Sequence, residues 1–160
     1  MKILVLYASK YGCTEDCAKY LKSKLIHETK IVNLKNHGMI DLQQYDWIII
    51  GGSIYVGKIQ KEVKHFCERN LQILLTKKVV LFMCCTTPEQ VNDFFKSNFQ
   101  SQLLKHAVET VNFGGELRQN KMGFFDKKIT AMVSKSETKK IEILYKNIDV
   151  LANSINTTIK

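Results

Sequence analysis

The stretch Lys2–Thr14, KILVLYASKYGCT, contains the features that decide the fold. Residues 2–8 are almost all branched or aromatic, and such an uninterrupted apolar run predicts a strand that is buried on both faces. The next residues are rich in hydroxyl groups and include one glycine, Gly12. Apolar residues then recur at helical spacing over residues 13–27, so this hydroxyl-rich loop is predicted to join a strand to a helix.

The rest of the chain repeats the alternation of strand and helix. Apolar runs predict further strands at residues 30–34, 45–52, 77–85 and 107–113. Helical spacing predicts helices over residues 59–71, from Pro88 through 103, and over residues 141–155. Buried strands that alternate with helices are typical of a parallel sheet covered on both faces. We therefore predict one α/β domain spanning residues 1–160.

The formal net charge of +9 favours an anionic partner, such as a cofactor phosphate, nucleic acid, a membrane surface or an acidic protein. A basic surface that only contacts solvent is the alternative. The lysines are spread along the chain without a dense basic arm, so we expect no nucleic-acid partner. No apolar run is long enough to span a membrane, and the N-terminus lacks the pattern of a signal peptide, which predicts a cytoplasmic protein.

The five cysteines predict neither a disulfide framework nor a metal site. Their number is odd, and no C-x-x-C occurs among Cys13, Cys17, Cys67, Cys84 and Cys85. No Cys/His pair has the spacing of zinc ligands either.

The loops that follow the predicted strands are the expected binding region, because ligands of open parallel sheets bind beyond the carboxyl ends of the strands. In the first loop, hydroxyl groups and backbone N–H groups at a helix N-terminus form a cradle suited to a phosphate. A plain turn with Thr14 as N-cap is the alternative. The candidate binding residues of this loop are Ser9, Lys10, Tyr11, Gly12, Cys13 and Thr14.

The first loop lacks the glycine patterns of P-loop and dinucleotide-binding proteins. It resembles instead the [ST]-x-x-G-x-T phosphate loop of the flavodoxin family, with Ser9, Gly12 and Thr14 at the matching positions. The segment GGSIYVGKIQKEV at 51–63 is similar to the family segment GGSIYxGxxxxxV, which packs on the isoalloxazine ring of FMN. This resemblance assigns flavin contacts to Ser53, Ile54, Tyr55, Val56, Gly57 and Lys58, and by position to Cys85, Thr86 and Thr87 in the third loop.

The resemblance implies a flavodoxin-like three-layer doubly wound sandwich, with a five-stranded parallel sheet in the order 2-1-3-4-5, and FMN as cofactor. Residues 112–135 also resemble the segment after the last strand of menaquinone-dependent protoporphyrinogen oxidases. The matching positions are Gly114, Gly115, Leu117, Arg118, Phe125, Asp126 and Lys127. This second resemblance implies an FMN-dependent oxidoreductase that oxidises protoporphyrinogen IX and passes electrons to a quinone.

Two other functions are weighed against this enzyme. Small electron carriers of the family exchange electrons with redox proteins, but they are acidic, whereas this chain is basic. A regulatory receiver domain needs acidic residues after its first strand, where this chain has Ser9 and Lys10. No catalytic side chain is assigned, because the flavin itself carries the electrons. The basic and apolar segment 122–135 is predicted either to contact an anionic membrane surface or to pack on the domain.

Overall fold

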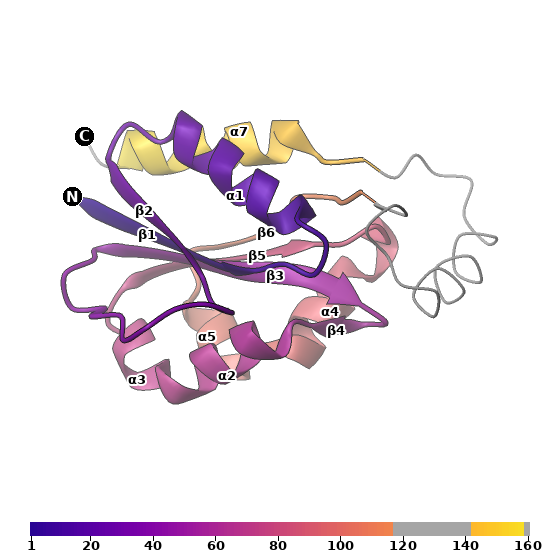
Figure 1. Cartoon of the computed structure of the whole chain (residues 1–160), viewed down its shortest axis with the longest axis horizontal. Coiled ribbons are helices and arrows are strands. Elements are labelled where there is room, and N and C mark those ends of the chain that lie inside the picture. Colours follow the sequence, from indigo (N-terminus) through magenta and orange to yellow (C-terminus); the bar gives the residue numbers. More distant parts are fainter. Residues whose placement is uncertain (117–141, 159–160) are drawn as a thin grey trace.

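The computed structural model describes residues 1–116 and 142–158, and Figure 1 shows the arrangement of its elements. In chain order these are β1 (Lys2–Ala8), α1 (Cys13–Lys24), β2 (Glu28–Asn33), β3 (Trp47–Tyr55), β4 (Lys58–Ile59), α2 (Lys61–Arg69), α3 (Leu71–Leu74), β5 (Lys78–Cys84), η1 (Pro88–Gln90), α4 (Val91–Asn98), α5 (Ser101–His106), β6 (Glu109–Asn112) and α7 (Tyr145–Thr158).

Five strands form a parallel sheet in the order β2-β1-β3-β5-β6. This confirms the predicted order, since these are the first to fifth parallel strands along the chain. The short strand β4 was not predicted, and it pairs antiparallel with the end of β3. It takes Ile59 out of the predicted 59–71 helix, so α2 begins only at Lys61.

Helices cover both faces of the sheet, as predicted. Figure 1 shows α1 and α7 on one face and α2 to α5 on the other. The strand β1 divides its side chains between the two cores: Ile3 and Val5 pack with α1 and α7, whereas Leu4 and Leu6 belong to the opposite cluster. Each such fully buried side chain contributes roughly 1.5–3 kcal/mol to stability.

The predicted helix after Pro88 is divided in the structure. Pro88 opens the short 3-10 helix η1, and α4 then ends at Asn98. Phe99 is extended, with φ −115° and ψ 149°, and its buried ring stacks on Phe95. The apolar repeat therefore continues across the break, because both helices bury side chains against the same face of the sheet.

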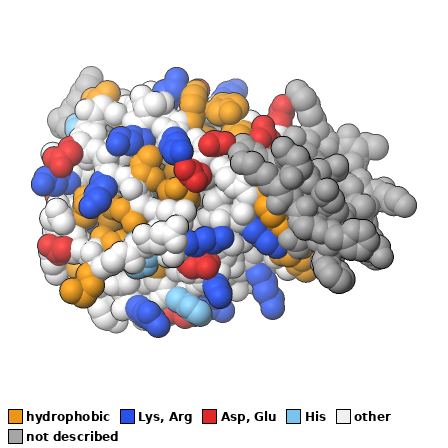
Figure 2. All heavy atoms as spheres, viewed as in Figure 1, with side chains coloured by type: hydrophobic (Ala, Val, Ile, Leu, Met, Phe, Trp, Pro, Cys, Tyr) orange, Lys and Arg blue, Asp and Glu red, His pale blue; other side chains and the backbone are white. Residues whose placement is uncertain are grey.

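One face of the molecule shows how the charged side chains are distributed. On the face that Figure 2 shows, basic side chains are scattered among acidic ones. No helix among residues 1–116 and 142–158 is long and apolar enough to cross a membrane.

Candidate functional site

A cavity opens where the carboxyl ends of β1, β3 and β5 meet, and we call it the main cavity because it brings together three of the predicted loops. Its lining consists of Ser9, Lys10, Tyr11, Cys13 and Thr14 after β1, Ser53, Ile54 and Tyr55 from β3, Cys84 and Thr86 at the end of β5, and Gly115 and Glu116 after β6. Cys84, Gly115 and Glu116 were not among the predicted binding residues.

The loop after β1 is organised by the side chain of Ser9 and by Gly12, a glycine in a left-handed conformation. Gly12 has φ 91°, and its N–H donates a hydrogen bond of 2.9 Å to Oγ of Ser9. The helix α1 begins directly afterwards at Cys13, so its first N–H groups lie beside the cavity. Gly12 occupies the N-cap position, and the alternative in which Thr14 caps the helix is therefore wrong.

Two hydroxyl groups in this cavity are buried without a hydrogen-bond partner among the described residues. They are Oγ1 of Thr14, on a side chain that is 0% exposed, and Oγ of Ser53. Leaving a hydroxyl buried and unpaired costs about 1–3 kcal/mol, so such groups in a native protein need an explanation. Thr14 and Ser53 both line the cavity, so a polar ligand bound there is a candidate for the missing partner.

A lysine lies across the aromatic ring that was predicted to stack on a flavin. The Nζ atom of Lys10 is 3.7 Å from the ring centroid of Tyr55 and 5.2 Å from that of Tyr11. This is a cation–π contact, which is worth roughly 0.5–2 kcal/mol. A planar ligand that stacks on this face of Tyr55 must first displace the ammonium group.

The predicted residues Val56 and Gly57 form the two-residue turn between β3 and β4. Their φ angles are 49° and 72°, and they lie between the paired residues Tyr55 and Lys58. Positive φ at both positions is typical of a tight hairpin, although it strains a β-branched residue such as Val56. Val56 and Lys58 do not line the main cavity. They line a neighbouring one, to which Lys10 and Tyr55 also contribute.

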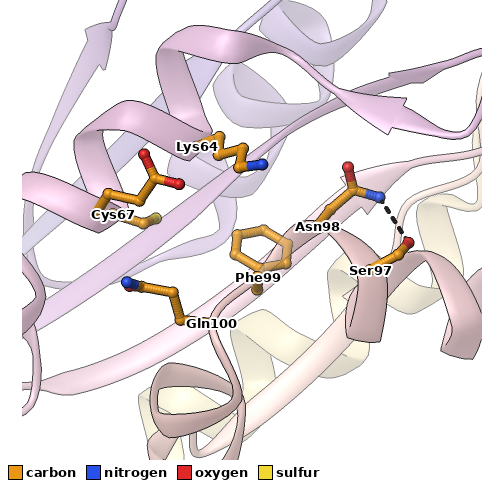
Figure 3. Close-up of a pocket in the computed structure, with 7 residues that line it drawn as sticks. Lys64, Cys67, Ser97, Asn98, Phe99 and Gln100 are labelled. Atoms are coloured by element: carbon orange, nitrogen blue, oxygen red, sulfur yellow. Dashed lines mark hydrogen bonds between the residues drawn. The ribbon is translucent and has the colours of Figure 1, made fainter.

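The side chain of Asn98 holds this turn through hydrogen bonds to its backbone. The sequence did not predict this role. The buried Asn98 side chain accepts a hydrogen bond from the N–H of Ile59 at 2.8 Å and donates to the carbonyl of Gly57 at 2.9 Å. It also bonds to Ser97, as the dashed line in Figure 3 shows. The only signal in the sequence is a polar residue between apolar helix positions, which does not reveal its partners.

Asn112 likewise holds the third predicted loop, which follows β5, through hydrogen bonds to its backbone. Its side-chain oxygen accepts hydrogen bonds from the N–H groups of Cys85 and Gly114, at 3.1 and 3.0 Å. Its amide donates to the carbonyl of Cys85 at 3.2 Å. The Cys85 sulfur accepts a hydrogen bond from the N–H of Thr87 at 3.4 Å, and neither residue lines the main cavity.

A second cavity, of about 250 Å³, lies between α2 and the break that separates α4 from α5. Figure 3 shows Lys64, Cys67 and residues 97–100 around it. No predicted binding residue lines it. The segment 112–135 resembles protoporphyrinogen oxidases, and its part from residue 117 onward lies outside the described residues. The segment 122–135, with its predicted membrane contact, therefore lies outside them too.

The comparisons with known proteins agree on the fold. The sequence model described as the flavodoxin domain matches residues 4–143. A search of curated proteins found no match. At identities of 16% or less, the solved structures below support the fold alone.

The WrbA-like flavodoxin of Agrobacterium tumefaciens is 16% identical, with 99% of each chain covered and a TM-score of 0.54. The flavodoxin of Streptococcus pneumonia is 15% identical, covering 84% of this chain and 99% of that one, with a TM-score of 0.50. The rubredoxin oxygen:oxidoreductase of Desulfovibrio gigas is 12% identical, with a TM-score of 0.57. The alignment covers 96% of this chain but only 36% of that longer protein.

Proposed function

Because the chain belongs to the flavodoxin domain family, we propose that it binds FMN in the main cavity and passes electrons from a donor to an acceptor. The observation that carries the proposal is the pair of buried hydroxyl groups on Thr14 and Ser53, which have no partner among the described residues and belong to two residues that line the same cavity. A ligand with several oxygen atoms would satisfy both of them.

The phosphate is assigned to the loop after β1. The first N–H groups of α1 are not used within the helix, and they add to the positive end of its dipole. Thr14 lies in this first turn, so its hydroxyl would be a further donor to a phosphate held there. Ser9 keeps the loop in shape through its bond to Gly12.

The flavin ring is assigned to the side of the cavity formed by Tyr55. The turn at residues 56–57 stays in position because the side chain of Asn98 forms hydrogen bonds to the backbone of Gly57 and Ile59. Tyr55 would offer its ring to the flavin once Lys10 moved from that ring face, and Lys10 would keep a positive charge near the site. When bound, FMN supplies the chemistry of reversible electron uptake, and the protein provides binding, orientation and charge.

Binding of FMN and of riboflavin tests the phosphate assignment. Riboflavin lacks the phosphate and cannot use the helix N-terminus, so we expect its affinity to be at least about tenfold lower, which is about 1.4 kcal/mol. Quenching of flavin fluorescence by the flavin-free protein measures both affinities. Equal affinities, or no quenching by FMN, would contradict the proposal.

We also propose that the protein is an enzyme with a quinone acceptor, not a carrier of very low reduction potential. The neighbouring cavity beside Tyr55 is lined by Lys10, Lys58 and Lys61 and by no carboxylate, and the main cavity adds one carboxylate, Glu116. Positive charges there favour a reduced, anionic flavin, and so raise its reduction potential relative to that in an acidic flavodoxin. The same charges suit an acidic porphyrinogen substrate. An electron carrier that docks an acidic redox protein is the alternative.

Anaerobic potentiometric titration distinguishes these two functions. Lys58→Gln is expected to lower the flavin potential by on the order of tens of millivolts, because one nearby positive charge is removed. Lys22→Gln, beside the distant cavity that Glu28 and Tyr45 line, is the matched control and should leave the potential unchanged. Assays with menadione and with protoporphyrinogen then test turnover. A potential as low as that of acidic flavodoxins, with no quinone reduction, would favour the carrier.

A further inference from the structure

Three thiols meet beneath the main cavity, although they lie far apart in the sequence. Cys13 and Cys17 are one helical turn apart on α1, and Cys84 is the last residue of β5. The sulfur atoms of these three buried residues all lie within 4.8 Å of one another. The other two cysteines are separate from this group: Cys67 lines the second cavity, and the Cys85 sulfur contacts residue 87.

We propose that Cys13, Cys17 and Cys84 bind a soft divalent cation, such as zinc or cadmium, through their three sulfur atoms. Three thiolates that each lie about 2.3 Å from one ion are separated from one another by about 3.8–4.0 Å. The observed separations are compatible with that geometry after small side-chain rotations. Thiolates are the ligands that soft cations prefer.

The surroundings offer both an entrance and a fourth ligand position. Cys13 and Cys84 line the main cavity, whereas Cys17 lies behind them and is 0% exposed. An ion therefore reaches the sulfurs from the cavity, and its remaining coordination position faces the same way. That position suits a water molecule or an anion.

The charge balance favours a divalent ion over a monovalent one. Three thiolates and one divalent cation leave a single negative charge, at the N-terminal end of the 12-residue helix α1. The positive end of a helix dipole stabilises such a charge, whereas a monovalent ion would leave two negative charges to be buried.

Protons leave the cluster when the ion binds. Mutual hydrogen bonds and burial raise the pKa of Cys84 well above its usual value, and the bond to Cys13 raises the pKa of Cys17. These thiols are therefore protonated before the ion arrives. Binding of the ion by Cys17 and Cys84 therefore releases their protons to the buffer, and no electron is transferred.

Titration of the reduced, flavin-free, full-length protein with Cd²⁺ tests the site. We expect one Cd²⁺ per chain by equilibrium dialysis, together with an ultraviolet thiolate-to-cadmium charge-transfer band. Cys17→Ser should weaken binding at least about tenfold, because one of the three sulfur ligands is removed. Cys67→Ser is the matched control: it removes another buried thiol that lies outside the cluster, and it should bind Cd²⁺ as the unmodified protein does.

A second measurement uses the unmodified protein, and it tests the metal site even if Cys17→Ser fails to fold. Cd²⁺ should slow the alkylation of residues 13, 17 and 84, mapped by mass spectrometry, and leave that of Cys67 unchanged. Absence of the charge-transfer band, equal binding by Cys17→Ser, or equal protection of Cys67 would overturn the proposal. The result is independent of the proposed function, because FMN binding is measured without the metal.

Discussion

Thr14→Val is expected to weaken FMN binding by roughly ten- to a hundredfold, while the flavin-free protein becomes no less stable. Hydrogen bonds to charged groups contribute about 1.5–3 kcal/mol, which corresponds to this loss of affinity. In the flavin-free protein the Thr14 hydroxyl is buried without a partner among the described residues. Valine has nearly the same shape as threonine, so replacing the hydroxyl by a methyl group removes the cost of burying an unpaired polar atom.

The two effects of Thr14→Val have opposite signs, and this makes the experiment specific. Fluorescence titration gives the affinity, and urea unfolding of the flavin-free protein gives the stability. Thr29→Val is a suitable control, because Thr29 lies on β2, its hydroxyl donates to the carbonyl of His27 just before that strand, and residue 29 does not line the cavity. A Thr14→Val protein that binds FMN normally would refute the role of this hydroxyl. A large loss of stability without FMN would show that the hydroxyl has a partner within the protein.

Gly51→Ala is expected to destabilise the fold by about 3 kcal/mol or more, which is at the upper end for overpacking of a core. A Cβ atom at this position would overlap the carbonyl oxygen of Phe82 and lie 2.6 Å from Cδ1 of its ring. Phe82 cannot give way easily, because it is 0% exposed and stacks on Phe113 with a centroid separation of 4.6 Å. The missing side chain of Gly51 thus provides the space that this aromatic pair occupies.

Gly52→Ala provides the matched comparison on the opposite face of the same strand. Its Cβ would lie 3.0 Å from Cγ2 of Val63 and 3.2 Å from the carbonyl oxygen of Ala8. A small shift of the valine relieves the closer contact, so we expect a cost of about 1 kcal/mol. Urea unfolding of both variants measures the difference. Equal destabilisation by the two substitutions would contradict the packing argument for the first of these glycines.

The sequence by itself determined the order of the parallel strands, and it predicted a binding site at their carboxyl ends. The apolar runs that became β1, β3 and β5 are 0% exposed over much of their length, because each contacts helices on both faces. A strand of that kind must belong to a covered parallel sheet, and the loops at its carboxyl end then meet at one edge. The hydroxyl and glycine pattern of residues 9–14 therefore predicts a binding loop at that edge.

Local signals did not reveal which residues support that site from other parts of the chain. Asn98 bonds to the turn at residues 56–57, and Asn112 joins the end of β6 to the loop after β5. Each is a single polar residue whose partners are distant in sequence, so periodicity carries no information about them. The short strand β4 was missed for a similar reason, since a two-residue strand exists only through its pairing with β3.

The cysteines show most clearly what only the tertiary structure decided. Their spacing in the sequence predicted no metal site, because zinc patterns rely on ligands that are close together along the chain. Packing of α1 against the end of β5 places Cys84 beside Cys13 and Cys17, with the three sulfur atoms within 4.8 Å. Burial patterns specify that a helix packs on a sheet. The angle of the helix to the strands and its position along them depend on the shapes of all the core side chains together. The sequence thus determined the parallel sheet and predicted its binding edge, whereas the close approach of these three thiols follows only from the packed core.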